Sequence, residues 1–268
     1  MTTLEVRGLS KDYRLRHGIR TRTLRAVDDV SFTLDHGRTV ALVGQSGSGK
    51  STIARLLLQL EQPTSGRILL DGEPVARRGS ALARYRRTVQ MVFQDPFASL
   101  NPFHDVEHHL TRPVRLHQRG LSDAEVHQRV LHLLERVRLT PAADFARRRP
   151  HELSGGQRQR VAIARALAPS PGVLIADEPV SMLDVSIRLG VLNLLATLQR
   201  EEDLGVLYIT HDLATARHFS DEILVLYQGR VVERGPADEV ILNPRHEYTR
   251  TLADAAPNPE RRLGELRR

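Results

Sequence analysis

The chain has 268 residues, of which 40% are hydrophobic and 26% are charged, so it can bury a core and is not a disordered polyelectrolyte. It contains no cysteine, which excludes disulfides, thiolate-ligated zinc, iron–sulfur clusters and a cysteine nucleophile. The formal net charge is +7, but the arginine runs are short, separated and not interleaved with aromatic residues, so we expect no nucleic acid partner.

Hydrophobic patterning predicts strands and helices that alternate along the chain. The expected strands, in chain order, are 30–34, 39–43, 66–72, 88–93, 173–176, 206–210 and a final hairpin of 223–227 with 230–233. The expected helices are 53–60, 122–138, 158–167 and 186–200, and residues 236–268 should be helical and then loose. No stretch approaches the roughly 18–20 apolar residues of a membrane helix, and residues 1–11 lack the apolar run of a signal peptide. We therefore expect a chain that neither spans a bilayer nor is secreted.

The middle of the chain differs in pattern from its flanks. Between residues 95 and 150, helical periods replace strand alternation, and Ser122 with Glu125 forms a capping box at the start of one helix. This predicts a helical insertion within an α/β body. The apolar strands, each followed by a polar turn and a helix, indicate a mostly parallel core sheet flanked by helices. Ligands of such sheets bind at the carboxyl ends of the strands.

A glycine-rich segment follows the predicted strand 39–43. Residues 44–51 match the G-x-x-x-x-G-K-[ST] phosphate-binding loop. Its glycines let successive backbone N–H groups point at phosphate oxygens, and the positive end of the next helix faces the same phosphates. Lys50, one of only two lysines, would meet the β and γ phosphates, and the Ser51 hydroxyl would meet Mg²⁺. A flexible linker is the alternative, but linkers do not usually lie between an apolar strand and an amphipathic helix. The residues predicted to bind ATP here are Gly44, Gln45, Ser46, Gly47, Ser48, Gly49, Lys50, Ser51 and Thr52.

Two acidic residues follow the predicted strand 173–176. Asp177 would hold Mg²⁺, directly or through water, and Glu178 would orient and polarise an attacking water as a general base. The alternative is a pair of acids that caps a helix. Together with the phosphate loop, the pair predicts nucleotide hydrolysis.

The pentapeptide Leu153–Gln157 precedes a predicted helix and resembles the signature motif of ATP-binding cassette (ABC) proteins. Physically it is a second anion-binding helix N-terminus, and a serine cap with a Gly–Gly turn is the alternative. The resemblance implies that two ABC ATPase domains pair head to tail, so that each signature caps the γ-phosphate bound by the opposite loop. The signature residues predicted to contact this nucleotide are Ser154, Gly155, Gly156 and Gln157.

Further positions match ABC proteins one by one. Gln94 resembles the glutamine that contacts magnesium and water, and His211 resembles the switch histidine at the γ-phosphate. Residues 181–184, ending in Asp184, resemble the loop that crosses the dimer interface, although Met182 stands where alanine is usual. Tyr13 corresponds to the aromatic residue that stacks on adenine, with simple core or edge packing as the alternative.

The resemblance covers about residues 3–240 and implies a P-loop NTPase fold of the ABC type. That fold has a mostly parallel core sheet, an N-terminal antiparallel β portion and an inserted helical subdomain. The ATPase domain would span 1–240, with the helical subdomain at about 95–165, and 241–268 would form a C-terminal extension and basic tail. The catalytic residues would be Glu178, His211 and Gln94, and Mg²⁺ would be held by Ser51, Gln94 and Asp177.

Two segments resemble the ATPases of oligopeptide, dipeptide and nickel importers. They are Gln94–Pro102 and the C-terminal Asn243–Leu252, in which Glu247 replaces the usual proline. Without cysteines, the chain more closely resembles the subunit that lacks the cysteine cluster found in some members. The implied partners are a second ABC ATPase, identical or different, two transmembrane permease subunits and, indirectly, an extracytoplasmic solute-binding protein.

The implied location is peripheral, on the cytoplasmic face of the membrane, with Asp95–Asn101 near the helix by which a permease couples to the ATPase. A soluble non-transport ABC ATPase and an exporter subunit are the alternatives. His104, Glu107 and His108 have helical spacing that could suit a metal, but a solvated helical face is the favoured interpretation.

Overall fold

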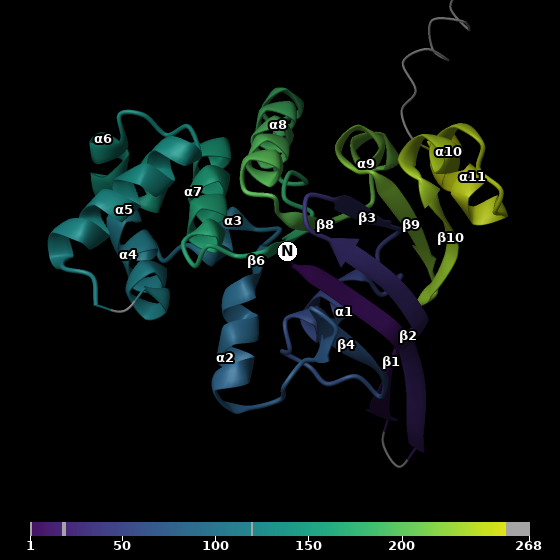
Figure 1. Cartoon of the computed structure of the whole chain (residues 1–268). Coiled ribbons are helices and arrows are strands. Elements are labelled where there is room, and N and C mark those ends of the chain that lie inside the picture. Colours follow the sequence, from purple (N-terminus) through teal and green to yellow (C-terminus); the bar gives the residue numbers. More distant parts are fainter. Residues whose placement is uncertain (1, 18–19, 119, 256–268) are drawn as a thin grey trace, which may run out of the picture.

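The computed structural model describes residues 2–17, 20–118 and 120–255. Within them, two sheets share one body, and a group of helices stands to one side (Figure 1). The strands are β1 Thr3–His17, β2 Arg20–Asp35, β3 Thr39–Val43, β4 Ser65–Leu70, β5 Glu73–Pro74, β6 Val89–Val92, β7 Val173–Asp177, β8 Gly205–Thr210, β9 Glu222–Tyr227 and β10 Arg230–Pro236.

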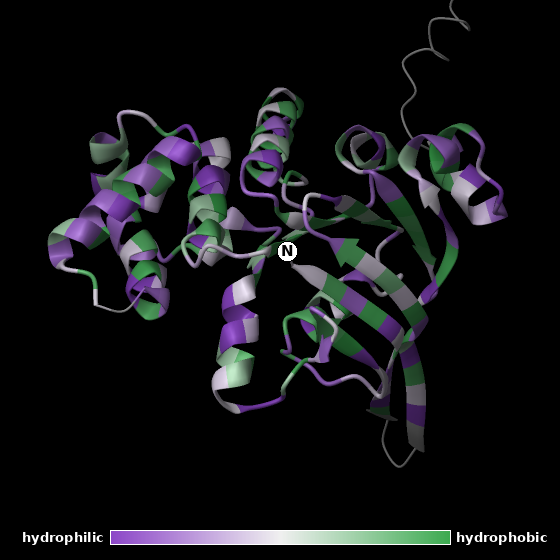
Figure 2. Cartoon of the chain, in the orientation of Figure 1, coloured by the Kyte–Doolittle hydropathy of each residue, from purple (hydrophilic) through white to green (hydrophobic). Residues whose placement is uncertain are grey.

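Strands β1, β2, β4 and β5 form an antiparallel sheet in the order β2-β1-β4-β5. The second sheet has the order β10-β9-β3-β8-β7-β6, and it is parallel except for the β9–β10 hairpin at one edge. Figure 2 shows hydrophobic and hydrophilic residues alternating along β1 and β2, as expected of strands with one buried face.

The core strands are buried on both faces, so they read as continuous apolar runs. In β3, Val40 and Leu42 pack between the two sheets, whereas Ala41 and Val43 point into the cluster shared with the inserted helices. β7 and β8 divide their residues between the same two clusters. The parallel sheet therefore has the antiparallel sheet and the helix at residues 50–57 packed on one face and the inserted helices on the other.

The helices are α1 Lys50–Leu57, α2 Gly79–Thr88, α3 Pro96–Ser99, α4 Val106–His117, α5 Asp123–Arg136, α6 Ala142–Arg147, α7 Gly155–Leu167, α8 Val185–Glu201, α9 Leu213–Phe219, α10 Ala237–Leu242 and α11 Glu247–Ala255, with a 3-10 turn η1 at Pro150–Glu152. Helices α3 to α7 make up the insertion (Figure 1). At α5, Ser122 and Glu125 form the predicted capping box.

The predicted fold class is confirmed, but several boundaries differ. The helix expected at 53–60 begins at Lys50, because the polar residues of the loop already have helical geometry, and it ends at Leu57. The helix expected at 158 begins at Gly155, because Ser154 caps it. Helices α2 and α9 were not predicted, since each buries few apolar side chains. The loose basic end expected after α11 lies outside the described residues.

Candidate nucleotide site

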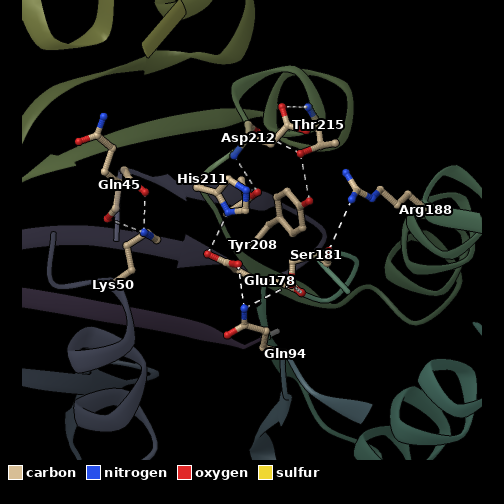
Figure 3. Close-up of polar contacts among 12 residues, drawn as sticks. Gln45, Lys50, Gln94, Glu178, Ser181, Arg188, Tyr208, His211, Asp212 and Thr215 are labelled. Carbon is tan, nitrogen blue, oxygen red and sulfur yellow. Dashed lines mark hydrogen bonds and ion pairs between the residues drawn. The ribbon is translucent and has the colours of Figure 1, made fainter. Parts of the chain in front are cut away.

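The register of the parallel sheet gathers the predicted site residues at one edge. Val43 pairs with Thr210, and Asp177 pairs with Ile209, so β3, β7 and β8 end at the same level. The phosphate loop follows β3, Glu178 follows β7, and His211 follows β8. Gln94 follows the neighbouring strand β6. Gln94 and Glu178, 84 positions apart in the chain, therefore come into contact (Figure 3).

The phosphate loop needs glycine where it passes close to other backbone. A Cβ at Gly44 would lie 2.3 Å from the Leu226 carbonyl oxygen, and one at Gly49 would lie 2.4 Å from that of Ala26. Gly49 also has φ +111°, in the left-handed region. Helix α1 begins at the next residue, so its free N–H groups and the positive end of its dipole face the loop.

Lys50 lies inside this loop. Its side-chain ammonium donates to the carbonyl oxygens of Gly44, at 2.5 Å, and Gln45, at 3.0 Å (Figure 3). Burial lowers the pKa of Lys50, while the nearby carboxylates of Glu178 and Asp177 act to raise it. The loop thus curls around a buried ammonium group.

The Glu178 carboxylate is contacted from two sides. Gln94 Nε2 donates to Oε2 at 3.1 Å, and His211 Nδ1 lies 3.1 Å from Oε1 (Figure 3). Glu178 has φ +45°, a conformation that is strained for a residue with a side chain and that concentrates at functional sites. Its N–H donates to the Ile209 carbonyl at 2.8 Å, which holds the turn against β8.

The charged form of the Asp177 carboxyl group is unfavourable in this position unless a cation is near. Burial and the adjacent Glu178 raise its pKa to about 6, and Lys50 and Arg55 act in the opposite direction. Asp177, Ser51 and Gln94 line the same pocket, and they offer carboxylate, hydroxyl and amide oxygens, the donors that Mg²⁺ prefers. In the described part of the chain, no group of three or more His, Asp or Glu side chains could hold a metal ion. A Mg²⁺ with few protein ligands fits here, because such ions complete their shell with phosphate oxygens and water.

These groups line one pocket of about 1010 Å³. Tyr13, Leu24 and Ala26 form part of its wall. The Tyr13 hydroxyl donates to Glu61 Oε2 at 2.6 Å, and burial together with this carboxylate raises the Tyr13 pKa. Of the predicted site residues, those that line the pocket are Tyr13, Gln45, Ser46, Gly47, Gly49, Lys50, Ser51, Thr52, Gln94, Asp177, Glu178 and His211. Gly44 and Ser48 belong to the loop but do not line the pocket.

The signature residues lie elsewhere. Ser154 Oγ accepts the Gln157 N–H at 3.3 Å, and Gln157 Oε1 accepts the Ser154 N–H at 3.0 Å, so the two residues cap α7 reciprocally. A Cβ at Gly156 would lie 2.6 Å from Ile187 Cγ2, and therefore glycine is needed where α7 meets α8. Asp184 precedes α8 without a side-chain cap bond. The pocket of this chain is thus lined by neither the signature nor Asp184.

The possible metal set, with His104 before α4 and Glu107 and His108 on it, does not converge on one point. Glu107 Oε1 lies 2.6 Å from His127 Nδ1 on α5. The rings of His104 and His108 stack with their centroids 3.9 Å apart. A stacked pair does not direct two ring nitrogens at one ion, so the arrangement is that of a helical face.

Sequence reasoning missed some pocket residues. Arg188 lines the pocket and donates from Nε to the Leu183 carbonyl at 2.8 Å, which holds the 181–184 segment. Leu252, on the C-terminal helix, also lines it. Arginine is abundant in this chain, so Arg188 carried no signal. Leu252 lies in the C-terminal segment, whose sequence indicated only the subfamily.

The family described as ABC transporter matches residues 27–181, more than half of the chain. The chain belongs to this family. The glutathione import ATP-binding protein GsiA of Salmonella typhimurium is 48% identical over 258 residues, which cover 95% of this chain and 41% of that protein. The oligopeptide transport ATP-binding protein OppF of Bacillus subtilis is 46% identical over 259 residues, which cover 96% of this chain and 83% of that protein.

A solved structure of a dimeric ABC cassette, MJ0796 in a post-hydrolysis state bound to ADP and Pi, superposes with a TM-score of 0.76 at 32% identity, covering 87% of this chain and 98% of that one. This ABC chain spans about two fifths of the length of the glutathione-import relatives it matches. The resemblance to ABC proteins is confirmed, and the relatives' names agree with the peptide-importer subfamily.

Proposed function

We propose that this ABC chain is the ATP-binding and ATP-hydrolysing subunit of a membrane importer for peptides or a related small solute such as nickel. One observation carries the chemistry: the phosphate loop, Asp177 and Glu178 line a single pocket at the carboxyl ends of the core strands. The names of the peptide and glutathione import relatives support the transport role.

ATP binds with its phosphates on the loop and its base toward Tyr13. Mg²⁺, held by Ser51, Asp177 and the Gln94 amide oxygen, would neutralise phosphate charge. Lys50 meets the β and γ phosphates, and His211 contacts the γ-phosphate. Glu178 accepts the proton of the attacking water as the general base.

A second ABC ATPase subunit, identical or different, completes the site head to tail. Ser154 to Gln157 form a helix N-terminus suited to an anion but lie outside their own chain's pocket. Beside them, Met182, Val185 and Leu189 are 53%, 79% and 52% exposed, an apolar surface that fits a protein partner. The solved relative MJ0796 is dimeric in its nucleotide-bound state.

Two transmembrane permease subunits are the proposed membrane partners, which places the chain peripherally on the cytoplasmic face. A groove of about 1430 Å³ separates α1 and β6 from the inserted helices and is lined by Phe93, Leu116, Arg112 and Arg165, among others. The predicted docking segment borders it: Phe97, on α3, is 49% exposed, and its ring lies under the Arg158 guanidinium at 4.3 Å. None of the described helices is both long and apolar enough to cross a bilayer.

Phe97→Asp is expected to break membrane docking while ATP binding stays within about twofold of the unchanged protein. A carboxylate would replace an apolar contact, but Arg158 can pair with it, so α3 should remain in place. Binding to permease-containing membranes is measured by co-sedimentation and ATP binding by calorimetry.

Leu242→Asp is the matched control, because Leu242 is 59% exposed on α10, outside the predicted docking segment 95–101. Retention of docking and ATP binding by Phe97→Asp would remove this segment from the interface.

The proposed function is tested by a tagged pull-down from detergent-solubilised native membranes, followed by mass spectrometry. Recovery of two multi-span proteins and a second cassette ATPase is the expected result. Ribosomal or DNA-associated proteins without any membrane protein would indicate the soluble, non-transport alternative. Multi-span proteins that export substrate in vesicles would indicate an exporter.

A further inference from the structure

The C-terminal helix α11 makes a direct bond to the phosphate loop. The Tyr248 hydroxyl oxygen accepts the backbone N–H of Gln45 at 3.0 Å, across 203 positions of sequence. Leu252 lies one turn further along α11 and lines the nucleotide pocket. Residues four apart share one face of a helix, so a single face of α11 meets both the loop and the pocket.

Helix α11 is also held by contacts with β9 and β10, outside the phosphate loop. The Glu233 carboxylate, on β10, accepts the N–H groups of Arg245 at 2.7 Å and His246 at 3.0 Å, just before α11 begins. The Tyr248 ring packs against that of Tyr227 on β9, with centroids 4.2 Å apart. The hydroxyl of Tyr248 is therefore placed by the hairpin at the sheet edge and not by a free side-chain rotamer.

Gln45 is thus held through both of its backbone polar groups, the N–H and the carbonyl oxygen. Its N–H is taken by Tyr248, and its carbonyl oxygen accepts from Lys50 Nζ at 3.0 Å and from the Ser48 N–H at 3.2 Å. Gln45 thus links the Tyr248 hydroxyl to the Lys50 ammonium, which would contact ATP. A shift of α11 would move the first turn of the loop and, with it, one of the two carbonyls that hold Lys50.

We propose that Tyr248 is a positioning residue of the nucleotide site: through the Gln45 amide, the C-terminal extension holds the phosphate loop in the geometry that binds ATP. The proposal rests on the proposed ATP site and assigns a role to the segment Asn243–Leu252. An N–H group that loses its only protein acceptor must find water or move, so the loop would become mobile without the hydroxyl. Tyr248 would act on ATP affinity and not on the chemical step, because its hydrogen bond is to the phosphate loop and not to Glu178.

Tyr248→Phe tests this, since it keeps the ring packing on Tyr227 and removes only the oxygen. We expect the Kd and KM for ATP to rise about fivefold, the typical effect of one neutral hydrogen bond, with kcat and the thermal midpoint nearly unchanged. The matched control is Thr251→Ala on the exposed side of α11, where the hydroxyl bonds only to its own helix at Glu247. A Tyr248→Phe variant with wild-type Kd and KM would overturn the proposal.

A double-mutant cycle identifies the route. Gln45→Pro removes the N–H, and Gln45 has no positive φ that would forbid proline. In that background, Tyr248→Phe should change ATP affinity by less than about twofold. The same fivefold loss in both backgrounds would show that Tyr248 does not act through this amide.

Hydrogen exchange of the Gln45 amide in the unchanged protein gives a further readout. Slow exchange is expected, and exchange as fast as in an exposed loop would contradict the bond. If the unchanged protein bound no ATP at all, the proposed function itself would fail, whereas ATP binding that is insensitive to Tyr248 would overturn only the role of this helix.

Discussion

Glu178→Gln should bind ATP with an affinity within about threefold of the unchanged protein and hydrolyse it about 10²–10⁴ times more slowly, the usual contribution of a general base. The amide has the same size as the carboxylate and keeps an oxygen for Gln94, so the pocket should retain its shape. It cannot accept a proton from water at neutral pH. With turnover blocked and ATP retained, the variant should accumulate as a closed pair of chains, which light scattering on a sizing column detects.

The control is Glu222→Gln, the same chemical change at a surface carboxylate that pairs with Arg234 at 2.8 Å on the hairpin edge. Its turnover should match that of the unchanged protein. Normal hydrolysis by Glu178→Gln would remove this residue from the role of base, and slow hydrolysis without a closed pair would argue against the head-to-tail assembly.

Lys50→Met is expected to weaken ATP binding about 10- to 100-fold. Hydrogen bonds to charged groups contribute roughly 1.5–3 kcal/mol, and each 1.4 kcal/mol corresponds to about tenfold in affinity. Methionine fills the same buried channel without a charge, so the loss should be of phosphate contacts more than of packing. Calorimetric titration with ATP in the presence of Mg²⁺ measures it.

Lys11→Met provides a matched control with the only other lysine. Lys11 donates to the Gln62 carbonyl at 2.8 Å and lies 5.1 Å from the centroid of the Tyr13 ring, but it does not itself line the pocket, so ATP affinity should fall less than about threefold. Equal losses in the two variants would indicate a general effect of charge on the chain. A Lys50→Met protein with unchanged affinity would mean that the loop holds phosphate by its backbone alone.

The parts of the site that depend on residues adjacent in the sequence could be predicted. The phosphate loop, the acid pair after β7 and the capping box of Ser122 with Glu125 each depend on a few neighbouring side chains, and short-range geometry decides them. The apolar runs predicted the core strands well, because a strand buried on both faces has no polar positions to confuse the pattern.

What could not be predicted depends on contacts between distant segments. The order β3-β8-β7-β6 is not sequential, and it brings Gln94, after β6, and His211, after β8, to the two sides of Glu178, after β7. Arg188 is one arginine among many, and the contact of Tyr248 with Gln45 spans 203 positions. Helix α2 exposes most of its residues, and α9 is only seven residues long with Leu213 and Ala216 buried, so hydrophobic periodicity gave them little signal.

The two contacts at Glu178 also connect two regions of the molecule. In the lone chain, Gln94 contacts one oxygen of the carboxylate and His211 lies against the other, which fixes the orientation of the group while each oxygen keeps a lone pair for water. Gln94 lies just before the inserted helices, whereas His211 follows β8 in the core sheet. A movement of the inserted helices relative to the core sheet would therefore change the contacts of the proposed base.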